Sequence, residues 1–385
     1  MKPAAEMRAW WSHRQGLNAV PAGGSLHSAL RQCGWARSVG GSNPYFAGFA
    51  RTRCSVEQAH QELTDQKVME LPSARGCTYV IPQEDYPLAL ALATKAVKND
   101  LGPARRISDI NDEEVENLTD ALVAVLNATP QSPAALRAKL GDKVREFGPE
   151  GKKEGLTTSL SLALGRAQRR GQAVRWPDSG RFDTQKYSYI RGNIPAFDGD
   201  PFAALAERYF SWIGAATLAQ FQNFAGISAT AARAATARLN LVDLGDGNLI
   251  LPDLQEEFDA FSRPTEPDYR LVSALDPVLH LRRDIPSLIA EDASNPSQVK
   301  LGGLHELQAN AIMDRGEIVG LWEYDPTAGD IAWFSWAPVS AALIDAVTLT
   351  EQFIRNELGD ARVFSLDSPA SRAGRIAAIR QGTLA

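Results

Sequence analysis

The sequence has few of the residues that would indicate a metal centre or a disulfide framework. Its three cysteines, Cys33, Cys54 and Cys77, are odd in number, widely spaced and without a Cys-x-x-Cys pair, so we expect neither structural zinc nor a disulfide network. This cysteine usage suits a reducing cytoplasm. The five histidines are scattered, and none forms a His-x-x-x-His or His-Glu-x-x-His motif. We therefore expect no bound metal ion.

Long apolar runs and the common cofactor motifs are also missing. No stretch of eighteen apolar residues occurs, and the first residues lack the apolar core of a secretory signal, so we expect no membrane partner. There is no P-loop and no Gly-x-Gly-x-x-Gly between a strand and a helix, which argues against a nucleotide cofactor. Gly-x-Ser-x-Gly is absent as well, so a serine-hydrolase turn is not expected. The sequence predicts a cytoplasmic protein without a cofactor.

Charge is distributed unevenly along a chain that can build several cores. With 385 residues and 44% apolar content, two to four compact units are expected. The formal net charge is −6, yet residues 137–191 hold thirteen Lys and Arg against six Asp and Glu, a local excess of +7. Local fields steer a polyanion more than the total charge does. A solvated helical face would have the same composition, and both interpretations stay open.

One order of elements recurs along the chain. Residues 132–140 and 157–171 are expected as helices, followed by strand, turn and strand up to residue 190, which is the order of a winged helix-turn-helix. Residues 203–252 repeat it, with the hairpin turn at Asp-Leu-Gly-Asp-Gly-Asn. Residues 26–82 follow it more loosely: a Ser-Gln capping box opens the helix at 55–65, Pro72 breaks the helix, and a strand covers 76–82. We expect repeated units.

The expected fold class is α+β, mainly α, with three tandem winged helix-turn-helix units and a β-rich C-terminal part. A three-stranded meander is expected over 305–336, because alternation there breaks at two turns, with a helix over 339–358. The expected domains are residues 1–100, 101–195 with a basic wing, 196–268, and 269–385.

The second unit supplies the first set of candidate DNA-binding residues. Phosphate contacts need positive donors along one surface, and the expected second helix and wing provide them. The aromatic residues between them are better explained as packing the hairpin on its helix. The predicted set is Arg166, Arg169, Arg170, Arg175, Arg181 and Lys186.

Six phrases occur in the order typical of one protein family and span residues 14–325. The phrases are RQGL (14–17), GWARSVGGSNPYFAGFAR (34–51), ARGCTYVIPQEDY (74–86), RRGQAVRWPDSGR (169–181), LVSALDPVLHLRRD (271–284) and AIMDRGEIVGLWEYD (311–325). On these phrases the chain resembles the winged-helix DNA-binding family of the AlkZ and YcaQ type, which contains alkylpurine and crosslink-repair DNA glycosylases. The resemblance also predicts a bacterial protein.

The resemblance implies winged helices lining a concave face for double-stranded DNA, damaged or intact. It implies cleavage of the N-glycosidic bond of alkylated or crosslinked purines, with a Gln-x-Gln or Gln-x-Asp motif that places the attacking water. That motif aligns with Trp35-Ala36-Arg37. The phrases also add Arg37, Ser38, Arg51 and Arg75 to the predicted DNA-binding residues.

The sequence departs from the family at these positions. Trp35 and Arg37 stand where the family has Gln and Gln or Asp, and Tyr79 stands where a His is expected. Arginine has no acceptor atom and stays protonated, so it can neither orient nor deprotonate a water. Its charge also opposes a positively charged sugar in the transition state. Asp276 and Asp284 are candidate compensating carboxylates, although Asp276-Pro277 also suits a turn cap.

Three functions remain open on the sequence. The first is a DNA-binding member of this family whose glycosylase chemistry is lost or altered. The second is a working DNA glycosylase, and the third is a ligand- or protein-interaction module built on winged helices. The third gains some support from the net negative charge and from the acidic segment at 109–120.

Overall fold

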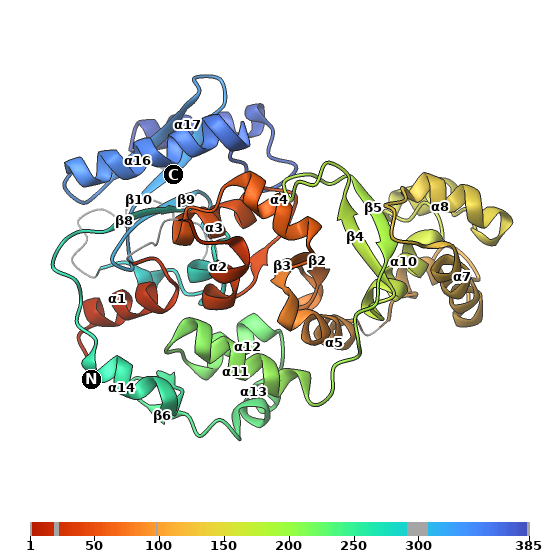
Figure 1. The fold of residues 1–385 in the computed structure, drawn as a ribbon, viewed down its shortest axis with the longest axis horizontal. Coiled ribbons are helices and arrows are strands. Elements are labelled where there is room, and N and C mark those ends of the chain that lie inside the picture. The colour runs from red at the N-terminus through yellow and green to blue at the C-terminus, as the bar shows by residue number, and fades with distance from the viewer. Residues whose placement is uncertain (1, 19–22, 98, 291–306, 383–385) are drawn as a thin grey trace.

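A computed structural model describes residues 2–18, 23–97, 99–290 and 307–382. The described chain is a mixed α/β fold in which helices predominate and the strands form small sheets (Figure 1). Residues 305 and 306, at the start of the expected meander, lie outside the described residues. None of the described helices is long and apolar enough to cross a membrane.

The N-terminal segment forms helices around a three-stranded antiparallel sheet of order β1-β3-β2. Its elements are α1 (Ala4–Arg14), α2 (Leu26–Cys33), β1 (Ala36–Arg37), α3 (Asn43–Thr52), α4 (Val56–Thr64), β2 (Val68–Pro72), β3 (Thr78–Pro82) and α5 (Tyr86–Ala96). The capping box at Ser55 and Gln58 is present, as predicted.

The expectation of a helix that Pro72 breaks was wrong, because the segment before Pro72 is a strand. Gln66 has a left-handed backbone (φ 56°) that turns the chain out of α4. Residues 68–72 then pair with 78–82. Pro72 stands at the last pair of this ladder, where a missing N–H costs little.

The second segment lies at one end of the longest axis of the molecule (Figure 1). Helices α7 and α10 pack on each other and share a core with α8, which includes Leu118, Leu122, Leu136 and Ala163. The elements are α6 (Gly102–Arg105), α7 (Asp112–Val125), α8 (Pro133–Leu140), α9 (Gly148–Lys153), α10 (Leu160–Arg169), β4 (Ala173–Pro177) and β5 (Tyr187–Arg191).

The third segment repeats this plan with shorter strands. Its helices enclose an aromatic core in which Tyr209 stacks on Phe224, with ring centroids 5.4 Å apart. The elements are α11 (Pro201–Ile213), α12 (Leu218–Ala225), α13 (Ala229–Thr236), β6 (Val242–Asp243), β7 (Leu249–Ile250) and α14 (Pro252–Ala260).

The three segments share one connectivity. In each, a residue that follows one helix (α2, α7 or α11) pairs antiparallel with the last strand of the unit. Two helices lie between that residue and the hairpin, and the second unit has α9 inserted between them. The three pairs are Ala36 with Val80, Gln131 with Tyr189, and Ala216 with Leu249.

The C-terminal part contains a four-stranded antiparallel sheet of order β11-β10-β9-β8, one strand more than expected. The additional strand β8 precedes α15 and pairs with β9. The three-stranded meander is therefore extended by a strand from a segment that lies well before it in the sequence. The elements are β8 (Tyr269–Val272), α15 (Pro277–His280), β9 (Asn310–Asp314), β10 (Glu317–Asp325), β11 (Asp330–Ser335), α16 (Ala341–Phe353) with a π-helical turn (Ile354–Leu358), and α17 (Pro369–Arg380).

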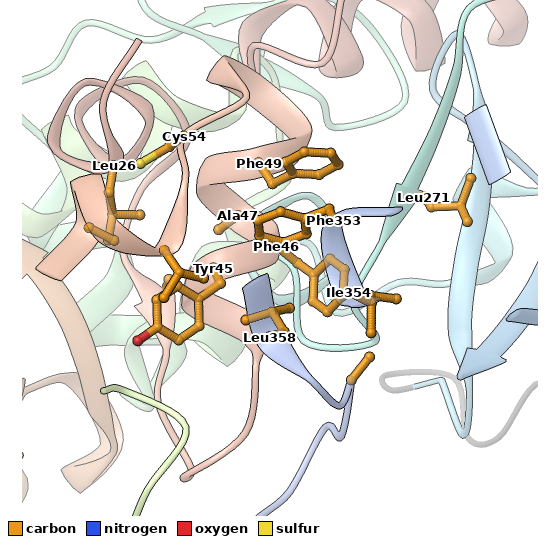
Figure 2. Close-up of a cluster of buried hydrophobic side chains, with 14 of the residues drawn as sticks. Leu26, Tyr45, Phe46, Ala47, Phe49, Cys54, Leu271, Phe353, Ile354 and Leu358 are labelled. Atoms are coloured by element: carbon orange, nitrogen blue, oxygen red, sulfur yellow. The ribbon is translucent and has the colours of Figure 1, made fainter. Parts of the chain in front are cut away.

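This sheet is covered on both faces by elements from both ends of the chain. One face and α16 enclose the apolar side of α3: Phe46 packs edge-on against Trp322, and Phe49 stacks on Phe353 with centroids 4.0 Å apart (Figure 2). The other face packs against α1, α15 and α17. The N-terminal unit and the C-terminal part therefore share continuous cores.

Candidate functional site

The family-motif positions lie on β1 and beside it, and the first of them is part of the core. Trp35 is completely buried and packs edge-on against Trp212, with centroids 5.3 Å apart. Its indole Nε1–H donates to Asp85 Oδ2 at 2.9 Å, and Asp85 Oδ1 accepts from Arg208 Nε at 3.0 Å. An enclosed indole whose donor is already used cannot hold a water for attack on a substrate.

Arg37 lies on the same face of the sheet as Tyr79, because the two residues are direct partners across β1 and β3. Its guanidinium donates to the Thr78 carbonyl at 3.2 Å and lies 5.5 Å from the centroid of the Tyr79 ring. Arg37 is half-buried. The Arg37 side chain is therefore partly open to solvent, and two residues of β3, Thr78 and Tyr79, already contact its guanidinium.

A histidine from a distant segment meets Tyr79. Tyr79 is completely buried, and its Oη lies 3.3 Å from Nε2 of His280, which ends α15. The resemblance led us to expect a histidine at position 79, where this chain has Tyr79; the imidazole that lies beside this tyrosine comes from a residue 201 positions further along the chain. We did not predict His280, although it lies within the phrase at 271–284.

The surroundings of this pair are cationic. Burial, followed in size by the guanidiniums of Arg37, Arg283 and Arg75, lowers the pKa of His280 to about 3. The imidazole is therefore neutral at physiological pH, and its Nδ1 has no hydrogen-bond partner among the described residues. Burial also raises the pKa of Tyr79, so its hydroxyl stays protonated.

Asp276 does not compensate for the missing motif, because it pairs with Arg51 in the interior. Both side chains are fully enclosed, and the two guanidinium–carboxylate contacts measure 2.9 and 2.7 Å. Asp276 also caps α15 by accepting from the Val278 N–H at 2.9 Å, so the turn-cap interpretation holds. An enclosed guanidinium cannot reach a phosphate, and the predicted DNA contact of Arg51 is replaced by this structural role.

The other candidate carboxylate is engaged as well. Asp284 Oδ2 accepts from Gln220 Nε2 at 3.2 Å, which ties the segment after α15 to α12. Together with Asp85 and Asp276, every carboxylate considered for this region has a protein partner. The charges that act on the Tyr79–His280 pair are positive, apart from the Cys77 thiol beside Tyr79.

Comparison with known proteins places this arrangement in a family. The sequence profile described as "DNA glycosylase AlkZ-like" matches residues 36–361. The chain belongs to the AlkZ-like DNA glycosylase family. None of the curated protein sequences matches significantly. Among solved structures, the Streptomyces sahachiroi DNA glycosylase AlkZ is similar, with a TM-score of 0.67 and 18% identity over 94% of this chain and 99% of that one. That likeness concerns the fold.

The opposite face of the same sheet carries a buried carboxylate in this AlkZ-like chain. Glu70 is 1% exposed, forms an ion pair with Arg175 of β4, and accepts from the Tyr187 hydroxyl at 3.1 Å. Burial raises the pKa of Glu70, and Arg175 opposes that rise. Ser38 is buried too. Arg175 therefore joins the first and second units through Glu70, whereas Ser38 is enclosed within the first unit, where its N–H donates to the Thr78 carbonyl at 3.0 Å.

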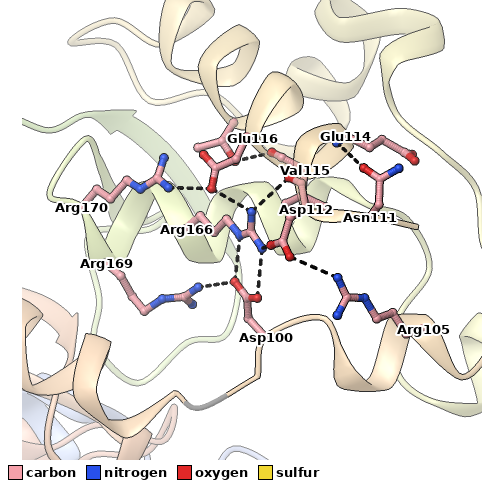
Figure 3. A network of polar contacts seen from close by, with 11 residues as sticks. Asp100, Arg105, Asn111, Asp112, Glu114, Val115, Glu116, Arg166, Arg169 and Arg170 are labelled. Carbon is pink, nitrogen blue, oxygen red and sulfur yellow. Dashed lines mark hydrogen bonds and ion pairs between the residues drawn. The ribbon is translucent and has the colours of Figure 1, made fainter. Parts of the chain in front are cut away.

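The basic set on α10 is largely neutralised by acidic residues before and within α7 (Figure 3). The Arg166 side chain is 7% exposed and contacts Asp100, Asp112 and Glu116 at 2.6–2.8 Å. Arg169 also binds Asp100, at 2.7 Å, and Arg170 binds Glu116, at 2.7 Å. Arg166 was predicted as a phosphate contact; the structure assigns it to holding α10 on α7.

The remaining predicted cations differ in how open they are. Arg181 forms an ion pair with Asp183 and donates to the Leu358 carbonyl at 3.2 Å, which ties the wing loop to the end of α16. Lys186 and Arg75 are exposed. In the part of the chain that the structure describes, no group of three or more His, Cys, Asp or Glu residues could hold a metal ion.

Proposed function

We propose that this protein binds double-stranded DNA as a member of the AlkZ-like family in which the glycosylase reaction has been lost. The observation that carries the proposal is the cationic environment of the Tyr79–His280 pair, on the face of the sheet where Arg37 replaces the water-placing residue. Partly exposed guanidiniums beside a neutral pair suit a phosphate. They do not suit a sugar that becomes positively charged.

The chemistry of hydrolysis supports the same proposal. Cleavage of a glycosidic bond needs an acceptor that orients water and a negative or dipolar group near the developing charge. Arg37 has no acceptor, Trp35 is enclosed, and Asp276 and Asp284 are bound to Arg51 and Gln220. None of the groups that the sequence offered for this task has the required atom available.

The repeated connectivity supports the architecture that such binding needs. We infer that the three segments are winged helices, because each has a bridge, two helices and a hairpin in the same order. A winged helix uses its last helix and its hairpin on a duplex. DNA as the partner would place the protein in the cytoplasm of a bacterium and in DNA repair.

One observation favours a second candidate function, an active DNA glycosylase. His280 is neutral, and Nδ1 lacks a partner among the described residues. If Nε2–H donates to Tyr79, Nδ1 becomes an acceptor, but this atom is buried and would hold a water for attack only after a local opening of the site. This candidate would place the attacking water on His280 in place of the missing Gln.

Two assays on the same purified protein separate the candidates. The first measures the association constant K for duplex DNA from about 50 to 200 mM salt. Each lost phosphate contact reduces the magnitude of the slope of log K against log salt by about 1. We expect Arg37→Ala and Arg75→Ala each to lower that slope, and Arg106→Ala, which removes an exposed arginine of α6's C-terminus, to leave it unchanged. Absence of any duplex binding at low salt would refute the proposal.

The second assay measures abasic-site formation on duplexes that carry N7-alkylguanine, with an active DNA glycosylase as control. We expect none from the wild type. Arg37→Gln restores an acceptor at a half-buried position, whereas Trp35→Gln would open a cavity in the core. Abasic sites from the wild type that disappear in His280→Ala, with folding retained, would replace the proposal with the second candidate.

A further inference from the structure

A cavity of about 590 Å³ lies between the first and third units. One wall comes from the β2–β3 turn and α5, and the other comes from α11 and the connection between α12 and α13. The lining residues that matter here are Arg75, Leu92, Lys95, Phe202, Ile227 and Ala231.

The charged residues of this cavity are both cations. Arg75 and Lys95 are exposed, and no acidic residue lines the cavity. Neither side chain makes a hydrogen bond or ion pair within the described part of the chain. This distinguishes them from Arg166, whose charge is matched by three carboxylates. Two cations without counter-ions in one concave place favour an anionic ligand.

The backbone directs Arg75 toward this cavity. Arg75 has a left-handed conformation (φ 60°), which is uncommon for a residue with a side chain. The hydrocarbon part of the Arg75 side chain packs directly against Gly226. A side chain at position 226 would not fit there, because its Cβ atom would lie only 2.6 Å from Arg75 Cγ. The Arg75 charge also acts on Tyr79 and His280. Arg75 therefore connects the cavity with the candidate functional site.

The rest of the wall is mostly apolar. Leu92, Phe202, Ile227 and Ala231 contribute hydrocarbon surface, and the Ser228 hydroxyl is already used as the cap of α13 by accepting from the Ala231 N–H at 3.2 Å. This lining suits a ligand that combines an apolar body with an anionic group. The volume is within the range of about 300–1,000 Å³ that small ligands occupy.

We propose that this cavity binds one nucleoside phosphate unit, with the base against Phe202 and Ile227 and the phosphate at Arg75 and Lys95. Its source is an unpaired nucleotide of a bound DNA strand or a free nucleoside monophosphate. For the strand-bound source the inference rests on the proposed DNA-binding function. It deepens that function by giving the DNA-binding surface a place for one unpaired base.

The test compares three probes with the full chain: a fully paired duplex, the same duplex with one unpaired adenine, and free 2′-deoxyadenosine monophosphate. Affinities are measured by fluorescence anisotropy for the duplexes and by calorimetry for the nucleotide. We expect the wild type to bind the bulged duplex about tenfold more tightly than the paired one, or to bind the free nucleotide. Tenfold is the order of magnitude of one charge-assisted contact.

Three variants assign any such preference to the cavity. Ala231→Trp fills the space without changing charge, and Lys95→Ala removes one exposed cation, so the second variant stays informative if the first does not fold. Lys152→Ala removes an equally exposed lysine of α9 and serves as the control. We expect the preference to fall to near unity in the first two variants and to persist in the third.

The outcomes separate this inference from the proposed function. A bulge preference or nucleotide binding that Lys95→Ala abolishes supports the inference, and the responding probe identifies the source. Equal affinity for both duplexes together with no nucleotide binding overturns it, even when paired duplex is bound. A preference that survives both Ala231→Trp and Lys95→Ala overturns it as well. Loss of all duplex binding overturns the proposed function, and the free nucleotide still tests the cavity.

Discussion

Replacing Asp276 by Asn tests whether this carboxylate is structural or chemical. The substitution keeps the shape of the side chain and an oxygen that can cap α15 at Val278. It removes the negative charge opposite Arg51. The Arg51 guanidinium then keeps the Gln15 and Ala47 carbonyls, at 2.6 and 3.2 Å, but has no anion in an interior from which water is excluded.

The size of the effect follows from that enclosure. Breaking a buried ion pair by neutralising one partner costs about 3–5 kcal/mol, because the other charge stays buried and unpaired. The pair also joins α3 to α15, so its loss acts on the contact between the N-terminal unit and the C-terminal part. A loss of this size is a large fraction of the stability of a typical domain, about 5–15 kcal/mol.

Urea unfolding followed by tryptophan fluorescence measures the loss, with Arg51→Met/Asp276→Asn as the matched variant. We expect the double variant to recover most of the stability that Asp276→Asn loses, since no unpaired charge remains. A loss below about 1 kcal/mol for Asp276→Asn, or no recovery in the double variant, would refute the reasoning. If the wild type does form abasic sites, their loss in Asp276→Asn at unchanged stability would return Asp276 to a chemical role.

Three further predictions address other buried polar groups. Burial raises the pKa of Glu323 from its ordinary 4.5 to about 7, against the opposing Arg375; stability tied to its protonated form is present below pH 4.5 and is lost by pH 7. We therefore expect the free energy of unfolding of the wild type to fall by roughly 3 kcal/mol between pH 4.5 and 7, and Glu323→Gln to remove most of this fall. An unchanged fall in Glu323→Gln would contradict the prediction. Arg166→Leu should cost about 1–3 kcal/mol in thermal unfolding without altering the salt dependence of DNA binding; a slope reduced by 1 at full stability would assign Arg166 to DNA. Trp35→Phe leaves Asp85, which is 4% exposed, without its indole donor, and should lower stability by about 1–3 kcal/mol; wild-type stability would show that this hydrogen bond contributes little.

Local signals in the sequence located most helices and hairpins correctly. The capping box at Ser55 and Gln58 marked a helix start, and Pro133 after Ser132 marked another. The strand over 68–72 was missed because Pro72 was taken as a helix breaker. The segment is a strand because it pairs with residues 78–82 across a turn. The fourth strand of the C-terminal sheet was missed for a different reason, since β8 has its partner about forty residues away.

The candidate site was harder to predict than the fold, because it depends on contacts between distant segments. The spacing of Arg166 and Arg170 correctly placed both on one face of a helix. It could not show that this face meets Glu116 of α7, about fifty residues earlier. The acidic segment at 109–120, which contains the start of α7, supported only the interaction-module hypothesis, because nothing in its sequence links it to α10. Likewise, no local pattern places His280 against Tyr79.

The stacking of Phe49 on Phe353 has a consequence for how the protein is made. During synthesis the apolar side of α3 emerges long before its partners on α16 and β10. At about 5–20 residues per second, roughly 300 residues separate the two rings by some 15–60 s. Throughout that interval Phe46 and Phe49 have no native surface to cover them. We therefore expect stalled chains that lack α16 to be recovered as aggregates or bound to a chaperone.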